Sequence, residues 1–84
     1  MNNKQRKTLE AAFSEPVSAN IAWADIESLL LAAGCTVREG SGSRVRFLFG
    51  QTILAVHRPH PRKEAKQYLV REVRDFLKEI GVTP

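Results

Sequence analysis

Arg44-Val45-Arg46-Phe47-Leu48-Phe49-Gly50-Gln51-Thr52-Ile53-Leu54-Ala55-Val56 is the stretch of sequence that decides the fold. In its first half, large apolar residues alternate with Arg44, Arg46 and Leu48, so one face of a strand over residues 44–49 packs while two arginines project from the other. Gly50-Gln51 then turns the chain into a more apolar strand over residues 52–56. On the N-terminal side, residues 35–39 predict a strand before the turn at residues 40–43, which completes a meander of three antiparallel strands.

Helical apolar stripes flank this sheet in the sequence. Residues 23–33 carry apolar side chains at i, i+3, i+6, i+7 and i+10, and residues 69–80 at i, i+4, i+7, i+8 and i+11. We expect the last helix to begin between residues 64 and 68, and a further short helix over residues 4–13. The predicted fold class is α+β, in the order α-β-β-β-α after a short N-terminal helix, with a three-stranded antiparallel sheet packed on two helices.

The length of 84 residues allows one small domain with no large enclosed cavity. We expect residues 1–20 to form an N-terminal extension that carries the short helix, and residues 21–84 to form the single domain. Cys35 is the sole cysteine, which excludes an internal disulfide and a multi-cysteine metal site. The N-terminus lacks the apolar run of a signal peptide and no stretch reaches membrane-spanning length, so we expect a cytoplasmic protein without a membrane partner.

The positive charge is concentrated in the middle of the chain. The formal net charge is +4, from 13 Lys and Arg against 9 Asp and Glu. Residues 38–66 hold seven of the basic residues and two glutamates, a net charge of +5, which leaves −1 for the rest of the chain. This distribution favours an anionic partner, and charge alone leaves RNA, DNA, lipid and an acidic protein open.

Both histidines of the chain lie in its only dense basic block, His57-Arg58-Pro59-His60-Pro61-Arg62-Lys63-Glu64-Ala65-Lys66. Imidazole exchanges protons near neutral pH, and Arg and Lys hold phosphate, so the block suggests chemistry or binding on nucleic acid. We expect Pro59 and Pro61 to hold both histidines on a stiff, extended connection after the third strand. Histidines that cap a loop are a second interpretation, and an incomplete metal site is a third.

General acid–base cleavage of RNA needs a proton acceptor for the 2′-hydroxyl, a proton donor for the leaving oxygen and cations around the phosphate. The chain supplies all three without a metal or other cofactor, with His57 and His60 as proton-transfer candidates. The candidates for holding RNA phosphate are Gly42, Ser43, Arg44, Arg46, Arg58, Arg62, Lys63 and Lys66. The glycine-serine turn lacks the lysine of a nucleotide-hydrolase phosphate loop, and a simple tight hairpin is its other interpretation.

Two motifs, Gly42-Ser43-Arg44-x-x-Phe47 and His57-Arg58-Pro59-His60-Pro61-x-Lys63-Glu64, resemble the HicA toxins of bacterial toxin-antitoxin pairs in order and spacing. The closing Val70-Arg71-x-x-Arg74-x-Phe76-Leu77-x-x-x-Gly81 is similar to the last helix of that family, and the resemblance covers about residues 21–82. It implies a double-stranded-RNA-binding-domain-like fold, an endoribonuclease that cleaves mRNA and inhibits translation, and neutralisation by a HicB antitoxin.

The chain departs from the family pattern at one position. The family reads Gly-Ser-His there and the resemblance makes that histidine catalytic, whereas this chain has Arg44, a poor general base; the family's second histidine matches His60. Three outcomes are open. His57 or His60 takes over proton transfer, Arg44 gives only electrostatic stabilisation in a slower enzyme, or catalysis is lost and RNA or antitoxin binding remains.

The leading hypothesis is a metal-independent endoribonuclease toxin with mRNA and a HicB-like antitoxin as partners, in which His57, His60 and Arg44 form the catalytic group. The competing hypothesis is a non-catalytic RNA-binding or regulatory module that acts through an antitoxin-like partner. A DNA-binding domain is disfavoured because the helix expected over residues 69–80 is mixed in charge rather than basic.

Overall fold

The computed structural model describes all residues from Met1 to Pro84. It contains three helices and three strands, in the order α1 (Asn3–Ala12), α2 (Trp23–Ala32), β1 (Thr36–Glu39), β2 (Arg44–Phe49), β3 (Thr52–His57) and α3 (Gln67–Glu79). The strands form one antiparallel sheet in the order β1-β2-β3. The predicted α+β fold, with its three-stranded meander and added N-terminal helix, is therefore confirmed.

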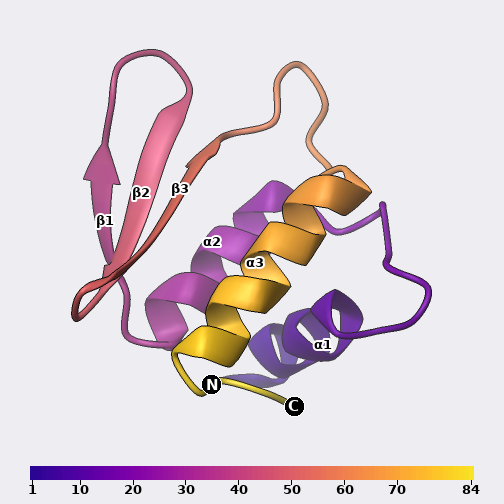
Figure 1. Cartoon of the computed structure of the whole chain (residues 1–84). Helices are drawn as coiled ribbons and strands as arrows, with labels where there is room; N and C mark the ends of the chain where they lie inside the picture. Colours follow the sequence, from indigo (N-terminus) through magenta and orange to yellow (C-terminus); the bar gives the residue numbers. More distant parts are fainter.

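The sheet lies on one side of a helical layer, as Figure 1 shows. Helices α2 and α3 form this layer, with α3 packed against β3, and α1 contacts both of them on the side away from the strands. The β1–β2 turn and the long connection from β3 to α3 both emerge at the top of this view. The fold thus brings these two segments to the same end of the molecule.

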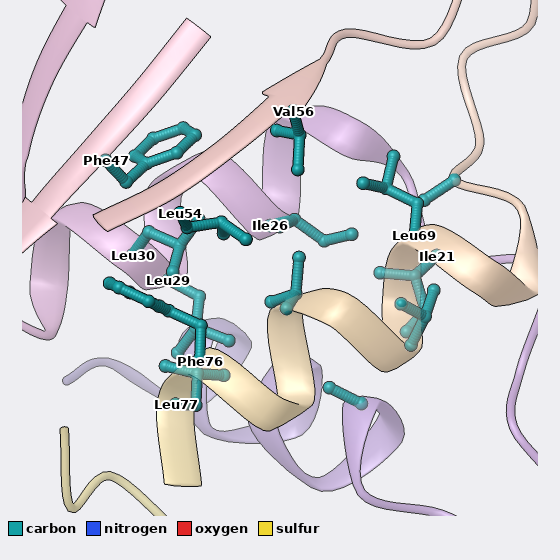
Figure 2. Close-up of a cluster of buried hydrophobic side chains, with 14 of the residues drawn as sticks. Ile21, Ile26, Leu29, Leu30, Phe47, Leu54, Val56, Leu69, Phe76 and Leu77 are labelled. Atoms are coloured by element: carbon teal, nitrogen blue, oxygen red, sulfur yellow. The ribbon is translucent and has the colours of Figure 1, made fainter. Parts of the chain in front are cut away.

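The core is formed where the apolar stripes of α2 and α3 meet the inner face of the sheet (Figure 2). Val45 and Phe47 of β2 are fully buried, whereas Arg44 and Arg46, which alternate with them, are exposed. The ring of Phe47 meets that of Trp23 edge to face, with 6.1 Å between the centroids. The alternation that predicted β2 therefore also determines which face of the sheet stays open to a ligand.

Helix α1 contributes to the same core. Its N-terminus is closed by a capping box, in which Asn2 accepts from the amide of Gln5 at 2.8 Å and the Gln5 side chain accepts from the Asn2 amide at 2.9 Å. Leu9 and Ala12 are buried against the other helices. The division into an extension of residues 1–20 and a domain of residues 21–84 stays a prediction. No helix has the length and apolar character needed to cross a membrane.

One local prediction about the third strand is wrong. We expected that strand to end at Val56, with His57 on the extended connection, but β3 continues through His57, which pairs with Arg44 of β2. Pro59, which has no backbone N–H to donate, lies two residues beyond His57. It therefore does not interrupt the pairing of His57 with Arg44. Therefore His57 is held by the sheet, whereas His60 alone lies on the proline-bounded connection.

Candidate functional site

The two segments singled out in the sequence meet at the top of the sheet. Arg44 and His57 are directly opposed in the β2–β3 register, and the Arg58 amide donates to the Ser43 carbonyl at 2.8 Å just beyond that pair. Beside them, the hydroxyl of Ser43 lies 3.1 Å from Nδ1 of His57. The sheet thus joins the glycine-serine turn to the histidine block, although the two are separated by more than a dozen residues.

The contact with Ser43 orients the exposed imidazole of His57. Because Nδ1 is occupied, Nε2 is the ring nitrogen left for a ligand, and no group of the chain bonds to it. When Nδ1–H donates to the serine oxygen, Nε2 is an unprotonated acceptor, which is the form required of a general base. In that tautomer, Nε2 can accept a proton from a ligand.

Two shallow hollows adjoin this imidazole. The first, which we call the sheet hollow, has a volume of about 380 Å³ and lies on the outer face of β2 and β3, where Gly40, Arg44, Arg46 and Ala55 are among its lining. The second, the histidine groove, has a volume of about 360 Å³ and lies between the connection and the start of α3; its polar lining includes Ser43, His60, Arg62, Lys66 and Tyr68. His57 is the one residue that lines both hollows.

Arginines on the outer sheet face form a strip of uncompensated positive charge. Arg38 of β1 is directly opposed to Arg46 of β2, and Arg44 lies two residues along the same face. Like charges directly opposite each other destabilise a sheet, and none of the three arginines forms an ion pair within the chain. An anionic ligand is the kind of partner that relieves this repulsion.

The glycine-serine turn leaves room for a phosphate close to the backbone. Gly42 has a φ of 62°, which favours glycine, and a Cβ added there would meet nothing within 4 Å. The amides of Gly42 and Ser43 make no backbone hydrogen bond, so these two donors are without a backbone partner in the chain. Both the tight hairpin and the phosphate-binding interpretation of this turn therefore fit its geometry.

Arg58, predicted to bind RNA, is held by the protein itself. Its Nε donates to Oε1 of Glu27 at 2.7 Å, and its two terminal nitrogens donate to Glu39 at 2.6 and 2.9 Å. Trp23 Nε1 donates to the same glutamate, Glu27, from the adjacent turn of α2. A phosphate would have to displace two carboxylates from this guanidinium, so Arg58 serves here to fasten the start of the connection to α2 and β1.

Replacing Arg58 by alanine is expected to lower the free energy of unfolding by about 1–3 kcal/mol, because Glu27 loses a charged hydrogen-bond partner at a three-quarters-buried position. Arg58 also holds the pKa of Glu39 below its ordinary value of 4.5, so this ion pair stabilises the fold above that pH and ceases to do so as the pH falls through the lowered pKa. Urea unfolding followed by Trp23 fluorescence between pH 3 and pH 7 measures both effects. An R58A variant with unchanged stability at pH 7 would contradict this role.

The far end of the connection is fastened through its backbone. The Trp23 amide donates to the Lys63 carbonyl at 2.8 Å, and the Ala65 amide donates to the Ile21 carbonyl at 2.9 Å, while Ala65 itself is fully buried. The exposed side chain of Lys63 lines neither hollow, unlike those of Arg62 and Lys66. The segment that carries His60 is therefore a loop anchored at both ends, and three of its four predicted phosphate ligands, Arg58, Arg62 and Lys66, line the groove.

Two residues of this surface were missed by the sequence analysis. Arg38 contributed only to the charge count, because its place opposite Arg46 depends on strand register. Tyr68 lies on the histidine groove and is 57% exposed, but it falls off the apolar stripe that defined the last helix. The sequence feature that could have indicated Tyr68 is its position, two residues after the end of the basic block.

Cys35 takes no part in this surface. It is buried in the core, and burial raises the pKa of its thiol, which keeps it protonated. Nowhere in the structure do three or more His, Cys, Asp or Glu side chains gather in a group that could hold a metal ion. The polar side chains that line the two hollows are imidazoles, hydroxyl groups, several cations and the carboxylate of Glu64.

Comparison with known protein families decides the affiliation of the chain. The family model described as the HicA toxin of bacterial toxin-antitoxin systems matches residues 23–82, from the first residue of α2 to just past α3. The chain belongs to the HicA toxin family. Searches of curated proteins and of solved structures each gave no match.

The candidate surface lies within the residues that the family model matches. The matched residues include the whole sheet, helices α2 and α3 and the connection from β3 to α3, while α1 precedes the match. This HicA toxin is therefore the toxin module of a toxin-antitoxin pair, whose partner is an antitoxin. The turn, the arginine strip and the two histidines lie in the part of the chain that defines the family.

Proposed function

We propose that this HicA toxin is a metal-independent endoribonuclease that cleaves mRNA and so inhibits translation in the cytoplasm. The observation that carries the proposal is the position of His57, which lines both the arginine-bearing sheet hollow and the groove that holds the second histidine. An RNA strand that crosses from one hollow to the other places a phosphate between cations and beside an imidazole.

The register of the sheet supports His57 as the general base. The family resemblance puts the catalytic histidine at the position occupied here by Arg44, and His57 is the residue directly opposite it on β3. Side chains at directly opposed positions have Cβ atoms about 4.5–5.5 Å apart. The imidazole of His57 thus lies within one strand spacing of the family's catalytic position. This favours proton transfer by His57 over a slower enzyme that relies on Arg44 alone and over a loss of catalysis.

In the proposed reaction, Nε2 of His57 accepts the proton of a ribose 2′-hydroxyl, whose oxygen attacks the adjacent phosphorus. The bond from phosphorus to the 5′-oxygen of the next nucleotide breaks, and His60 donates a proton to that leaving oxygen. The products are a 2′,3′-cyclic phosphate and a new 5′-hydroxyl. Arg44 is fully charged at neutral pH and stabilises the developing negative charge on the phosphate oxygens without exchanging a proton.

The remaining cations bind the phosphates of the RNA that flank the cleaved bond. Arg46 extends the sheet hollow, and Arg62 and Lys66 line the groove on the other side of the imidazole. The amides of Gly42 and Ser43 are further donors at the turn. Arg58 contributes indirectly by fixing the loop, and Lys63 acts through long-range attraction from outside both hollows.

The most direct cellular test is expression of the chain without its antitoxin. Growth arrest with cleavage of cellular mRNA supports the proposal, and a H60A variant should then permit growth. A folded wild-type chain that neither arrests growth nor cuts mRNA would refute it. We propose a HicB-like antitoxin as the partner, and co-expression of the small reading frame adjacent to this one should restore growth and yield a complex on purification.

The alternative function, an RNA-binding module without catalysis, draws on the uncompensated strip of arginines. Both functions predict that R44A and R46A each weaken RNA binding and each lower the salt slope of log K by about 0.7 on single-stranded RNA. The control is K78A, which changes an exposed cation in the last turn of α3. Titrations by fluorescence anisotropy at several salt concentrations measure the slopes, and unchanged slopes for both arginine variants would exclude this surface from RNA binding.

A further inference from the structure

Tyr68 is an exposed aromatic residue for which the fold provides no reason. It is 57% exposed, more than any other large hydrophobic side chain of the chain. The buried stripe of α3 runs through other positions, and the Tyr68 hydroxyl makes no hydrogen bond within the protein. An aromatic ring left on the surface in this way offers a face to a ligand.

The surroundings of this ring identify the class of ligand. Tyr68 lines the histidine groove together with the cations Arg62 and Lys66, and with both histidines. A groove that combines cations for a backbone with an aromatic ring for a base is typical of proteins that bind single-stranded nucleic acid. The volume of about 360 Å³ lies within the range of small-ligand pockets, which is adequate for one nucleotide.

We propose that Tyr68 stacks on an unpaired base adjacent to the phosphate held at His57 and His60, so that this HicA toxin selects single-stranded segments of RNA. A base inside an A-form helix is stacked between its neighbours and offers no face to a side chain, whereas a base in a loop or a single strand does. This inference deepens the proposed function and rests on the same groove. It concerns substrate selection, which the double-stranded-RNA-binding-domain-like fold does not by itself indicate.

The position of Tyr68 at the start of α3 fixes the backbone that carries the ring. It is the second residue of the helix, and the next two residues, Leu69 and Val70, are buried in the core. The preceding turn is held by the backbone bond from Ala65 to Ile21. Little conformational freedom of the backbone is therefore lost when a base stacks, which favours binding.

Binding is best measured on an oligonucleotide that cannot be cleaved. A short 2′-O-methyl RNA has no free 2′-hydroxyl, and a 2-aminopurine in it reports stacking through quenching of its fluorescence. We expect Y68L to weaken binding of the single strand by about 5- to 150-fold and to abolish part of the quenching. Y68F keeps the ring and should bind within about twofold of wild type, because the hydroxyl has no assigned role.

Two controls keep this test specific. L31A removes another large side chain that is about half exposed, on α2, and should leave binding unchanged. The same sequence annealed to its complement should bind wild type and Y68L equally. Thermal unfolding of each variant confirms that the exposed substitution leaves the fold intact.

Either of two results would overturn the proposal: single-strand binding by Y68L equal to wild type, or a loss by Y68F as large as that by Y68L. The outcome is separable from that of the proposed catalysis, since the probe cannot be cut. Failure to cleave ordinary RNA with normal Tyr68-dependent binding would reject the ribonuclease and retain this inference. Cleavage of ordinary RNA with binding that does not depend on Tyr68 would retain the ribonuclease and reject this inference.

Discussion

Replacing His57 by alanine is expected to lower the rate of RNA cleavage by about 10²- to 10⁴-fold, the usual contribution of a positioned general base. The reason is structural: His57 is the only residue that lines both hollows, and it lies directly opposite Arg44, where the family resemblance places a catalytic histidine. The affinity for RNA should fall by no more than a few-fold, since the arginine strip remains. Single-turnover cleavage of a labelled RNA, with binding measured in parallel, separates the two quantities.

The matched control for this substitution is H57Q. Glutamine can keep a hydrogen bond to Ser43 and similar bulk, but it cannot exchange a proton, so it should be as slow as H57A. R44H restores the histidine of the family pattern and should cleave at least as fast as wild type. Cleavage by H57A and H57Q at the wild-type rate would assign proton transfer elsewhere.

Replacing Phe47 by alanine is expected to lower the free energy of unfolding by about 3–5 kcal/mol, the usual cost of removing a buried phenylalanine. Phe47 is fully buried and meets Trp23 edge to face at the contact between the sheet and α2. For a domain of this size, each kcal/mol changes the unfolding midpoint by about 4–8 °C, so we expect a decrease of at least about 12 °C. Thermal unfolding followed by the fluorescence of the only tryptophan measures it.

L31A is the comparison for this prediction, because Leu31 is 52% exposed and its truncation should change stability by less than about 0.5 kcal/mol. F47L conserves most of the buried volume, so its loss of unfolding free energy should lie between those of F47A and L31A. A decrease of under 1 kcal/mol for F47A would contradict the packing of the inner sheet face on α2, and with it the orientation of Arg44 and Arg46 toward solvent.

The helices and strands could be predicted to within a few residues because their signals are local. Alternation of apolar and charged residues around Phe47 fixes a strand of period two, and the stripe that ends near Gly81 fixes a helix. The end of β3 was misplaced because Pro59 is a strong local signal for a break, whereas the pairing of His57 with Arg44 depends on the register of the whole hairpin.

The candidate site was only partly predictable, since its residues are defined by contacts across the fold. The basic block and the glycine-serine turn were both singled out from the sequence, but their meeting at one end of the sheet depends on the pairing of β2 with β3. Charge could not tell which cations are free, and Arg58 proved to be ion-paired with carboxylates 31 and 19 residues away in the chain. Tyr68 was missed for the same reason. Its position outside the apolar stripe of α3 indicates only that it is on the surface, and not that it lines the groove.

We propose that this HicA toxin cleaves RNA by itself, with its own histidines as acid and base. The measurement that tests it most directly is incubation of the purified chain, free of antitoxin, with single-stranded RNA in the presence of a chelator. We expect fragments that end in a 2′,3′-cyclic phosphate and begin with a 5′-hydroxyl, and no such fragments from a folded variant lacking His57 and His60. Intact RNA with wild-type protein, or undiminished cleavage by the double variant, would contradict it.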